Sequence, residues 1–388
     1  MLSGITVVDF TRHLSGPYCS MRLADMGARV IKMEALPGGD PERLLGPRIA
    51  GVGSRFLAIN RSKESVALNL RAEAGKEIAF ALASQADVVL ESFRPGVMAL
   101  LGLDYDSIAE VKPDIVYCSI TGYGQVGPLN QVGGQDLNVQ ALSGLLSFNA
   151  SFGGQPLIPG VPVADLACGM YASEQICAAL VRREREGRGA YLDIAALDVL
   201  GSWMSQHALL IHNQMLDEAE SLGSGLVNHG LYEAADGRYV AFAAVEEKFW
   251  VNFCHAVGRE EWEALSDFRI SRQMELYEEM KALFLSRTQA EWHELGLEVD
   301  CCLTAVEEAD TLLANPFWEG RELLYSQGAG GQLQLRSHVG QNQAEMEQSP
   351  LLGAHTHRVL RERLHVTDEQ LKKWEAMGLI GREQVERG

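Results

Sequence analysis

The first half of the chain alternates short apolar stretches with longer segments that have helical spacing. ITVVDF (5–10), RVIKMEA (29–35) and DVVLESF (87–93) are rich in β-branched residues, as buried strands are. Between such stretches, RAEAGKEIAFALASQA (71–86) places its apolar residues on one face of an amphipathic helix. Strands that alternate with helices in this way form parallel sheets with helices on their faces. The pattern therefore predicts an α/β fold.

The second half of the chain has a different pattern, which starts at the glycine-rich stretch SLGSGLVNHG (221–230). The segment GLYEAADGRYVAFAAV (230–245) is typical of two strands joined by an Asp-Gly turn. The chain is then largely helical to about residue 325, a polar stretch follows at 327–349, and two helices are expected after it. The glycine-rich stretch is the best candidate for a domain boundary.

The composition limits the classes of partner that the protein is expected to bind. The 388 residues carry a net charge of −19, which argues against nucleic acid, because binding it requires a concentrated basic surface. No apolar run reaches the roughly 18–20 residues that span a bilayer, and no signal peptide is evident, so we expect a cytoplasmic protein without a membrane partner. Seven scattered cysteines, mostly in apolar segments, predict reduced, buried thiols rather than disulfides or a metal site.

The stretch VPVADLACGMYASEQICAAL (161–180) contains a lone carboxylate, Asp165, where an extended segment meets an apolar helix that is expected to end before Gly187. Aspartate is a favoured N-cap, because its side chain accepts a hydrogen bond from a free backbone N–H. The alternative is a nucleophile whose partners lie elsewhere in the chain. Known phosphate-loop, dinucleotide, serine-hydrolase and zinc-protease motifs are absent, and His355 and His357 form an H-x-H pair typical of a helix surface. The residues alone leave both interpretations of Asp165 open.

A series of stretches along the chain resembles the class III coenzyme A-transferase family. This family includes formyl-CoA and carnitine CoA-transferases, and α-methylacyl-CoA racemase is a relative. The resemblance is collinear and covers nearly the whole chain. It is carried by SGPYCSMRLADMGARVIKMEALPGGDPER (15–43), FLAINRSKESVALNLR (56–71), ESFRPGVMALLGLDYDSI (91–108), IVYCSITGYGQVGP (115–128), GQDLNVQALSGLLS (134–147), VADLACGMYA (163–172), EREGRGAYLDIAALD (184–198), YEAADGRYVAFAAVEEKFW (232–250) and GAHTHRVLRE (353–362).

The resemblance implies a large Rossmann-like domain with a mostly parallel sheet and a smaller α+β domain. It places the large domain at residues 1–210 and 330–388 and the small domain at 225–325, with linkers at 211–224 and 326–329. In the family, two subunits interlock like the links of a chain. The resemblance therefore implies an obligate, ring-like homodimer.

Asp165 stands where the family carries its catalytic aspartate. The resemblance implies that Asp165 attacks an acyl-CoA donor, forms a mixed anhydride and then an aspartyl-CoA thioester, and passes coenzyme A to a free carboxylic acid. Capping and catalysis are compatible, because a helix N-terminus favours an ionised carboxylate. The intermediates must be kept from water, and Gly223, Ser224 and Gly225 match a mobile glycine loop that covers the site in formyl-CoA transferase. A plain interdomain linker explains the same residues equally well.

Coenzyme A is expected as a substrate, with neither a metal ion nor a permanently bound cofactor. The resemblance assigns the following residues to its site: His13, Leu14, Ser15, Leu68, Arg71, Ser92, Phe93, Arg94, Gln135 and Asp136. Arg71 and Arg94 are natural phosphate partners, because the guanidinium fork matches phosphate oxygens. A solvated surface arginine is the alternative interpretation of each. With a net charge of −19, local basic residues must hold such an anion against the overall field.

The chain departs from formyl-CoA transferase at two basic positions of the nucleotide site, which are Ala35 and Leu100 here. The phosphates must therefore be recognised differently in detail. Lys32, Arg43 or Lys63 are candidates for the substitute basic residue.

Two other activities are weighed against the transferase. The racemase relative needs a histidine and the aspartate as bases, but Gln135 stands in the place of the histidine, and glutamine cannot take a proton from carbon. The segment around Glu246 nevertheless resembles the racemase branch, so an acyl-CoA racemase is kept as the alternative. A coenzyme A thioester-binding protein without turnover is a third possibility, which the intact VADLACG stretch disfavours. The acceptor is expected to be a carboxylic acid, for example a small dicarboxylate or a hydroxy acid. Gln135 and Asn138 either offer hydrogen bonds to such an acid or are ordinary residues of a helix start.

Overall fold

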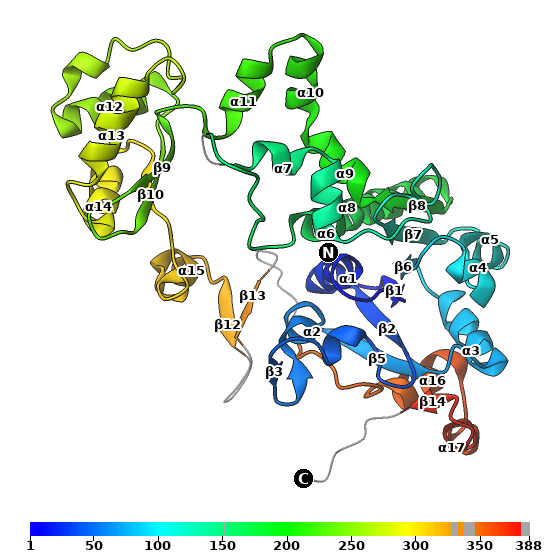
Figure 1. Ribbon diagram of the computed structural model, residues 1–388. Coiled ribbons are helices and arrows are strands. Elements are labelled where there is room, and N and C mark those ends of the chain that lie inside the picture. Colours follow the sequence, from blue (N-terminus) through cyan, green and yellow to red (C-terminus); the bar gives the residue numbers. More distant parts are fainter. Residues whose placement is uncertain (151–152, 327–332, 337–345, 382–388) are drawn as a thin grey trace. The chain divides into compact units, whose positions relative to one another are not determined.

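A computed structural model describes residues 1–150, 153–326, 333–336 and 346–381 (Figure 1). The chain divides into two compact units. The large unit is formed by residues 1–143, 159–202 and 317–388, and the small unit by residues 144–158 and 203–316. None of the described helices is long and apolar enough to cross a membrane.

A seven-stranded sheet forms the centre of the large unit, with the strand order β14-β5-β2-β1-β6-β7-β8. Its strands are β1 (Thr6–Asp9), β2 (Arg29–Ala35), β5 (Lys63–Leu68), β6 (Val88–Glu91), β7 (Val116–Thr121), β8 (Ala190–Ala195) and β14 (Ile380–Gly381). Neighbouring strands pair in parallel, except that β14 runs antiparallel to β5. The structure confirms the predicted α/β fold with a mostly parallel sheet.

Helices cover both faces of this sheet. On one face, α1 (Ser15–Asp25) and α8 (Val163–Glu186) pack against each other and against the strands, and α3 (Glu73–Ala83) lies on the other face. The remaining elements that belong mainly to the large unit are α2 (Ser54–Ile59), α4 (Val97–Leu101), α5 (Tyr105–Ala109), α6 (Asp136–Leu142), α9 (Ala196–Trp203), α15 (Pro316–Gly320), α16 (Thr356–Leu364), α17 (Asp368–Ala376), the short helix η1 (Pro41–Arg43), and the strand pairs β3 (Arg48–Ile49) with β4 (Val52–Gly53) and β12 (Leu324–Ser326) with β13 (Leu333–Leu335).

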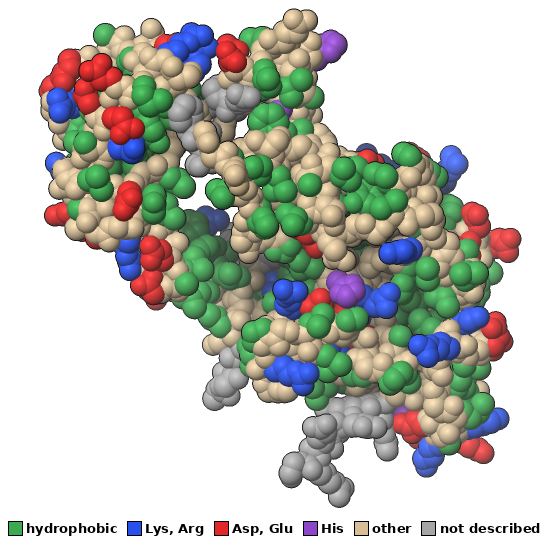
Figure 2. Space-filling view, in the orientation of Figure 1, with side chains coloured by type: hydrophobic (Ala, Val, Ile, Leu, Met, Phe, Trp, Pro, Cys, Tyr) green, Lys and Arg blue, Asp and Glu red, His purple; other side chains and the backbone are tan. Residues whose placement is uncertain are grey.

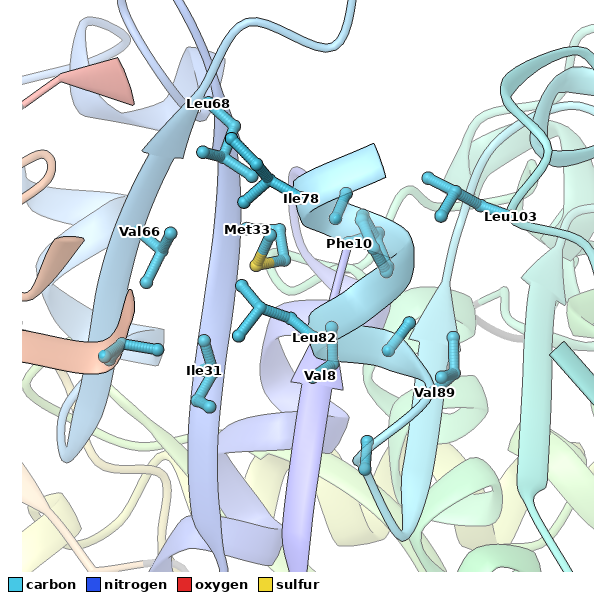
Figure 3. Close-up of a cluster of buried hydrophobic side chains, with 14 of the residues drawn as sticks. Val8, Phe10, Ile31, Met33, Val66, Leu68, Ile78, Leu82, Val89 and Leu103 are labelled. Atoms are coloured by element: carbon cyan, nitrogen blue, oxygen red, sulfur yellow. The ribbon is translucent and has the colours of Figure 1, made fainter. Parts of the chain in front are cut away.

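The core beneath α3 explains why the strand sequences are so apolar. Side chains alternate between the two faces of a strand, so every second residue of β1, β2 and β5 faces this helix. These side chains pack with Ile78 and Leu82 of α3 and are almost fully buried (Figure 3): Val8, Phe10, Ile31, Met33, Val66 and Leu68. Burial of each such side chain contributes about 1.5–3 kcal/mol. The core thereby fixes the strand ends from which the loops of the site leave.

The C-terminal helices complete the large unit beside β5. The backbone N–H of Ser65 in β5 donates to Nδ1 of His355 at 3.1 Å, and Nε2 of His357 lies 3.0 Å from Oε1 of Glu375 in α17. Both histidines are half-buried. The prediction that they are surface residues is wrong, because the fold brings β5 and α17 against the start of α16, where both histidines lie.

The small unit has its own antiparallel sheet and an aromatic core. Its strands β9 (His229–Glu233), β10 (Tyr239–Ala243) and β11 (Leu303–Ala305) have the order β11-β10-β9, and the predicted Asp-Gly turn joins β9 and β10. Its helices are α7 (Leu145–Phe148), α10 (Ser205–His212), α11 (Leu216–Ser224), α12 (Glu247–Val257), η2 (Glu260–Trp262), α13 (Met274–Phe284), α14 (Gln289–Val299) and η3 (Leu312–Ala314). The core is built from Phe242, Trp250, Phe253, Phe284 and Trp292, among others.

The segments between the expected domains are more regular than a linker suggests. Helices α10 and α11 occupy most of the expected linker 211–224, and residues 144–150 and 153–158 belong to the small unit. Residues 327–329 of the second linker lie outside the described residues. The domain ranges drawn from the family resemblance stay a prediction.

Candidate active site

Asp165 lies in the first turn of α8, but it does not cap the helix. The helix begins at Val163 and Pro162 precedes it, so Asp165 is the third helical residue. The capping interpretation is therefore wrong. The helix begins earlier than expected because Pro162 has a φ of −75°, which suits a helix start, and lacks an N–H that would be left unpaired there.

Side chains from two other helices hold Asp165. Ser15, the first residue of α1, donates its hydroxyl to Oδ1 of Asp165 at 2.5 Å. Asp136, the first residue of α6, accepts the backbone N–H of Asp165 on its own Oδ1 at 3.0 Å. Backbone N–H groups in the first turn of a helix have no acceptor within the helix, so Asp136 supplies the capping interaction from outside α8. Gln140 donates to Oδ2 of Asp136 at 2.5 Å and thereby fixes this carboxylate.

A glycine allows α1 to approach α8 this closely. Gly169 lies one turn after Asp165 on α8, and a Cβ atom added to it would lie only 2.5 Å from the backbone oxygen of Ser15. Any larger residue would push the two helices apart. The bond between Ser15 and Asp165 therefore depends on the absence of a side chain at Gly169.

The pKa of Asp165 is raised above its ordinary value, chiefly because burial removes water from the carboxylate. The hydrogen bond from Ser15 lowers this pKa, the nearby Asp136 raises it further, and His13 lowers it. Burial thus outweighs the preference for an ionised group that we expected from the helix N-terminus. The carboxylate is less hydrated than one on the surface, and its solvent shell is replaced by fixed protein groups.

A cavity of about 360 Å³ opens above the carboxyl ends of the parallel strands of the large unit, where ligands of α/β sheets bind. Asp165 lines it together with most of the residues expected at the coenzyme A site: His13, Leu14, Ser15, Ser92, Phe93, Arg94, Gln135 and Asp136. Arg71 lines a neighbouring cavity of about 170 Å³. Leu68 is fully buried in the core, so it lies away from both cavities.

Three arginines surround the two cavities without an acidic partner among the described residues: Arg12, Arg71 and Arg94. All of them are exposed, and Figure 2 shows basic side chains around a histidine on one face of the large unit. The Arg12 guanidinium lies over the Phe93 ring, 4.6 Å from its centroid, and both residues line both cavities. Sequence analysis missed Arg12, although it precedes His13 in the same loop.

His13 has an unusual backbone conformation beside Asp165. Its φ of +67° lies in the left-handed region, which non-glycine residues rarely adopt and which often marks a functional site. Nδ1 of His13 lies 3.2 Å from Oε1 of the buried Glu42. The fold therefore holds this imidazole at the wall of the cavity by its backbone and by a carboxylate that the sequence alone did not indicate.

Comparison with known proteins identifies the kind of enzyme that carries this site. Residues 2–356 match the sequence model of CoA-transferase family III. The chain belongs to this family. Proteins of the family use coenzyme A thioesters as substrates, which confirms the transferase class and the substrate type expected from the sequence.

Relatives of this CoA-transferase match it over nearly their whole length. Succinyl-CoA:glutarate CoA-transferase of Homo sapiens is 30% identical, over 99% of this chain and 91% of the human protein. Succinate–glutarate CoA-transferase of Agrobacterium fabrum is 31% identical, over 93% of this chain and 95% of its own. A crystal structure of Rv3272 from M. tuberculosis superposes with a TM-score of 0.80 at 29% identity, and covers 92% of this chain and 98% of that chain.

The basic residues expected to replace Ala35 and Leu100 are not available to phosphates in this CoA-transferase. They are buried, and each is bound to groups of the protein itself. Lys32 pairs with Asp40 at 3.0 Å, Arg43 with Glu34 at 2.6 Å and Lys63 with Asp9 at 3.6 Å. This expectation is therefore wrong, because the fold uses these charges inside the protein.

Gln135 and the glycine-rich segment are placed as follows. Gln135 precedes α6 and lines the cavity, and its backbone N–H donates to Asn138 at 3.1 Å. Gly223 and Ser224 form the end of α11 in the small unit, and Gly225 follows the helix. The role of Gly223, Ser224 and Gly225 as a lid stays a prediction.

All seven cysteines are free and most are buried, and the described residues contain no cluster of side chains suited to a metal ion.

Proposed function

We propose that this CoA-transferase moves coenzyme A from a dicarboxylic acyl-CoA, such as succinyl-CoA, to a second dicarboxylic acid, with Asp165 as the nucleophile. The observation that carries the proposal is the position of Asp165 at the wall of the cavity, with Oδ1 bound to Ser15. The names of the human and Agrobacterium relatives, which pair a succinyl donor or succinate with glutarate, support dicarboxylic substrates.

The reaction proceeds through two kinds of covalent intermediate on Asp165. The carboxylate attacks the donor thioester and forms a mixed anhydride, and coenzyme A leaves as its thiolate. The thiolate attacks the aspartyl carbonyl to give an aspartyl-CoA thioester and the free donor acid. The acceptor carboxylate displaces coenzyme A from this thioester, and the thiolate then attacks the acceptor's carbonyl and regenerates Asp165.

The free arginines around the cavities hold the phosphates of coenzyme A in this proposal. Arg12 and Arg94 line the cavity that contains Asp165. Arg71 lines the neighbouring cavity, which shares Arg12 and Phe93 with the first. Their side chains have no carboxylate partner among the described residues, so they can pair with phosphate oxygens without breaking an internal ion pair. Arg12 thereby supplies the charge that Ala35 and Leu100 lack.

We also propose the interlocked homodimer and the glycine lid. The surface of a single chain leaves apolar side chains uncovered on α8, where Met170 and Tyr171 are 48% and 40% exposed. In the small unit, α10 buries none of its residues, although it carries Leu209 and Ile211. Apolar surfaces of this kind are typical of interfaces, and a second copy of the chain is the partner that the family resemblance implies. Closure by Gly223, Ser224 and Gly225 would keep the anhydride from water.

The test is intact-protein mass spectrometry after mixing with succinyl-CoA, followed by hydroxylamine trapping and peptide mapping. We expect an adduct on Asp165 in the wild type and none in Asp165→Asn. Asp198→Asn is a matched control, because Asp198 is the third residue of α9 and is exposed. The absence of an adduct from the wild type, or an adduct that persists in Asp165→Asn, contradicts the proposal.

A further inference from the structure

The two carboxylate oxygens of Asp165 have different surroundings. Oδ1 accepts the Ser15 hydroxyl at 2.5 Å, whereas none of the described residues is seen to donate to Oδ2. Oδ2 is therefore the oxygen open to an incoming acyl group. Once Oδ2 carries the acyl group, Oδ1 becomes the carbonyl oxygen of the aspartyl anhydride, and it already lies in contact with a hydroxyl donor.

We propose that the Ser15 hydroxyl is a catalytic group that stabilises the negative charge on Oδ1 whenever the aspartyl carbonyl carbon, Cγ, is attacked. The inference rests on the proposed function, because it requires the covalent intermediates on Asp165. It extends the expected role of Ser15, which was contact with coenzyme A. The donor contacts the oxygen on which charge develops and is in place before the reaction starts, as in an oxyanion hole.

The charge moves through Oδ1 in two of the steps. When the thiolate attacks Cγ of the anhydride, a carbon–sulfur bond forms and the carbonyl electron pair moves to Oδ1. The pair returns as the Cγ–Oδ2 bond breaks, and the donor acid leaves as a carboxylate with that oxygen. When the acceptor carboxylate attacks Cγ of the thioester, a carbon–oxygen bond forms, the same oxygen receives the pair, and coenzyme A leaves as its thiolate.

The other two steps place the charge elsewhere. In the first and last transfers, the attacked carbon belongs to the acyl group of the donor or acceptor, so the oxyanion forms on the substrate. The Ser15 hydroxyl is bound to Oδ1 of Asp165 and therefore does not stabilise the substrate oxyanion. Loss of the hydroxyl is therefore expected to slow the passage from anhydride to thioester more than the formation of the anhydride.

The position of Ser15 supports this role. It is the first residue of α1, so the positive end of the helix dipole adds to the stabilisation of charge on Oδ1. Its backbone oxygen packs directly against Gly169 of α8, which fixes the distance between the two helices. The hydroxyl is thus a preorganised donor rather than a surface group that must be recruited.

The test follows the mass of the protein with time after mixing with succinyl-CoA in the absence of an acceptor. The wild type is expected to pass to the adduct that carries coenzyme A, whereas Ser15→Ala accumulates the succinyl adduct on Asp165. Turnover of Ser15→Ala is expected to fall by ~10²-fold, the usual effect of removing one oxyanion donor. The acid limb of its pH–rate profile should also move to higher pH. In the wild type the hydrogen bond from Ser15 lowers the pKa of Asp165, so its loss raises that pKa.

Two further variants separate chemistry from packing. Ser15→Thr keeps the hydroxyl and is expected to restore most of the turnover. Ser173→Ala is the matched control, because the Ser173 hydroxyl accepts a hydrogen bond from Arg22 at 3.3 Å across the same contact between α1 and α8. It should leave the succession of adducts unchanged. Thermal melting shows that each variant is folded before its kinetics are compared.

The outcomes distinguish this inference from the proposed function. If the wild type forms no adduct on Asp165, the proposed function fails and the role of Ser15 fails with it. If the wild type forms both adducts and Ser15→Ala passes between them at the wild-type rate, only the role of Ser15 is overturned. A folded Ser15→Thr that is as slow as Ser15→Ala overturns it too, since the hydroxyl is still present.

Discussion

Replacing Gly169 by alanine tests the contact on which the site is built. The added Cβ would lie 2.5 Å from the backbone oxygen of Ser15 and 3.1 Å from a ring carbon of Tyr18. Close carbon–oxygen contacts in proteins are about 3.3 Å long, so α1 and α8 must separate by about 0.8 Å. Such a shift would lengthen the hydrogen bond between Ser15 and Asp165 from 2.5 Å to about 3.3 Å, beyond the usual range.

The size of the effect follows from two opposing contributions. Overpacking of a well-packed contact costs about 1–3 kcal/mol. Alanine in place of a helical glycine stabilises a helix by about 0.5–1 kcal/mol. We therefore expect the free energy of unfolding of Gly169→Ala to fall by about 0–2.5 kcal/mol. Turnover should fall as well, because the Ser15 donor moves away from Oδ1.

Gly201 provides a matched control within the large unit. It lies inside α9, and a Cβ added there meets no atom within 4 Å, so Gly201→Ala should stabilise the protein by about 0.5–1 kcal/mol. Urea unfolding and steady-state kinetics of both variants measure the two effects. If Gly169→Ala is as stable and as active as Gly201→Ala, the close contact between α1 and α8 does not exist as described.

Three further predictions concern charge, pH and assembly. Arg12→Gln should raise the KM for succinyl-CoA by about tenfold through loss of a charge-assisted hydrogen bond, whereas Arg188→Gln, at an exposed site past the end of α8, should not. Burial raises the pKa of Glu91 from 4.5 to about 7, so the folded state keeps a proton that the unfolded state loses between these pH values. The contribution of Glu91 to the free energy of unfolding should therefore fall by about 3 kcal/mol as pH rises from 4.5 to 7. The difference between urea unfolding of the wild type and of Glu91→Gln, measured across this pH range, should show that fall. Leu209→Asp on α10 should weaken the proposed homodimer, and sedimentation at several concentrations should show more monomer than for the wild type; an unchanged dimer contradicts the proposed interface.

The parallel sheet could be predicted from sequence because its strands are buried on both faces. RVIKMEA forms β2 over the residues that its pattern indicated, Arg29–Ala35. By contrast, β14 is only Ile380–Gly381, and two residues carry no periodicity. Its strand character comes from pairing with β5, whose residues lie more than three hundred positions earlier. Local pattern cannot indicate a strand that exists only through such a partner.

The loops that form the site could be predicted from the sequence, but the residues that contact their side chains could not. The loops after β1 and β6 follow strand ends, so a family resemblance predicts well that they line the site. The residues alone could not decide whether Asp165 caps α8, because the acceptor for the backbone N–H of Asp165 comes from Asp136 on another helix. Lys32 failed as a phosphate ligand for the same reason, since Asp40, which neutralises it, is brought close only by folding. A sequence shows a charge, but the fold decides whether that charge is already satisfied.

The edge of the large sheet has a consequence for the synthesis of the protein. The N–H of Ala67 in β5 donates to Oγ1 of Thr356 at 3.1 Å, and β14 pairs with the end of the same strand. The groups that cover β5 are thus made long after it, when the small unit has already been translated. At about 5–20 residues per second, the 313 residues from 69 to 381 take roughly 15–65 s. For that time the nascent chain carries an uncovered strand edge, which is where a chaperone would be expected to bind and where premature termination would favour aggregation.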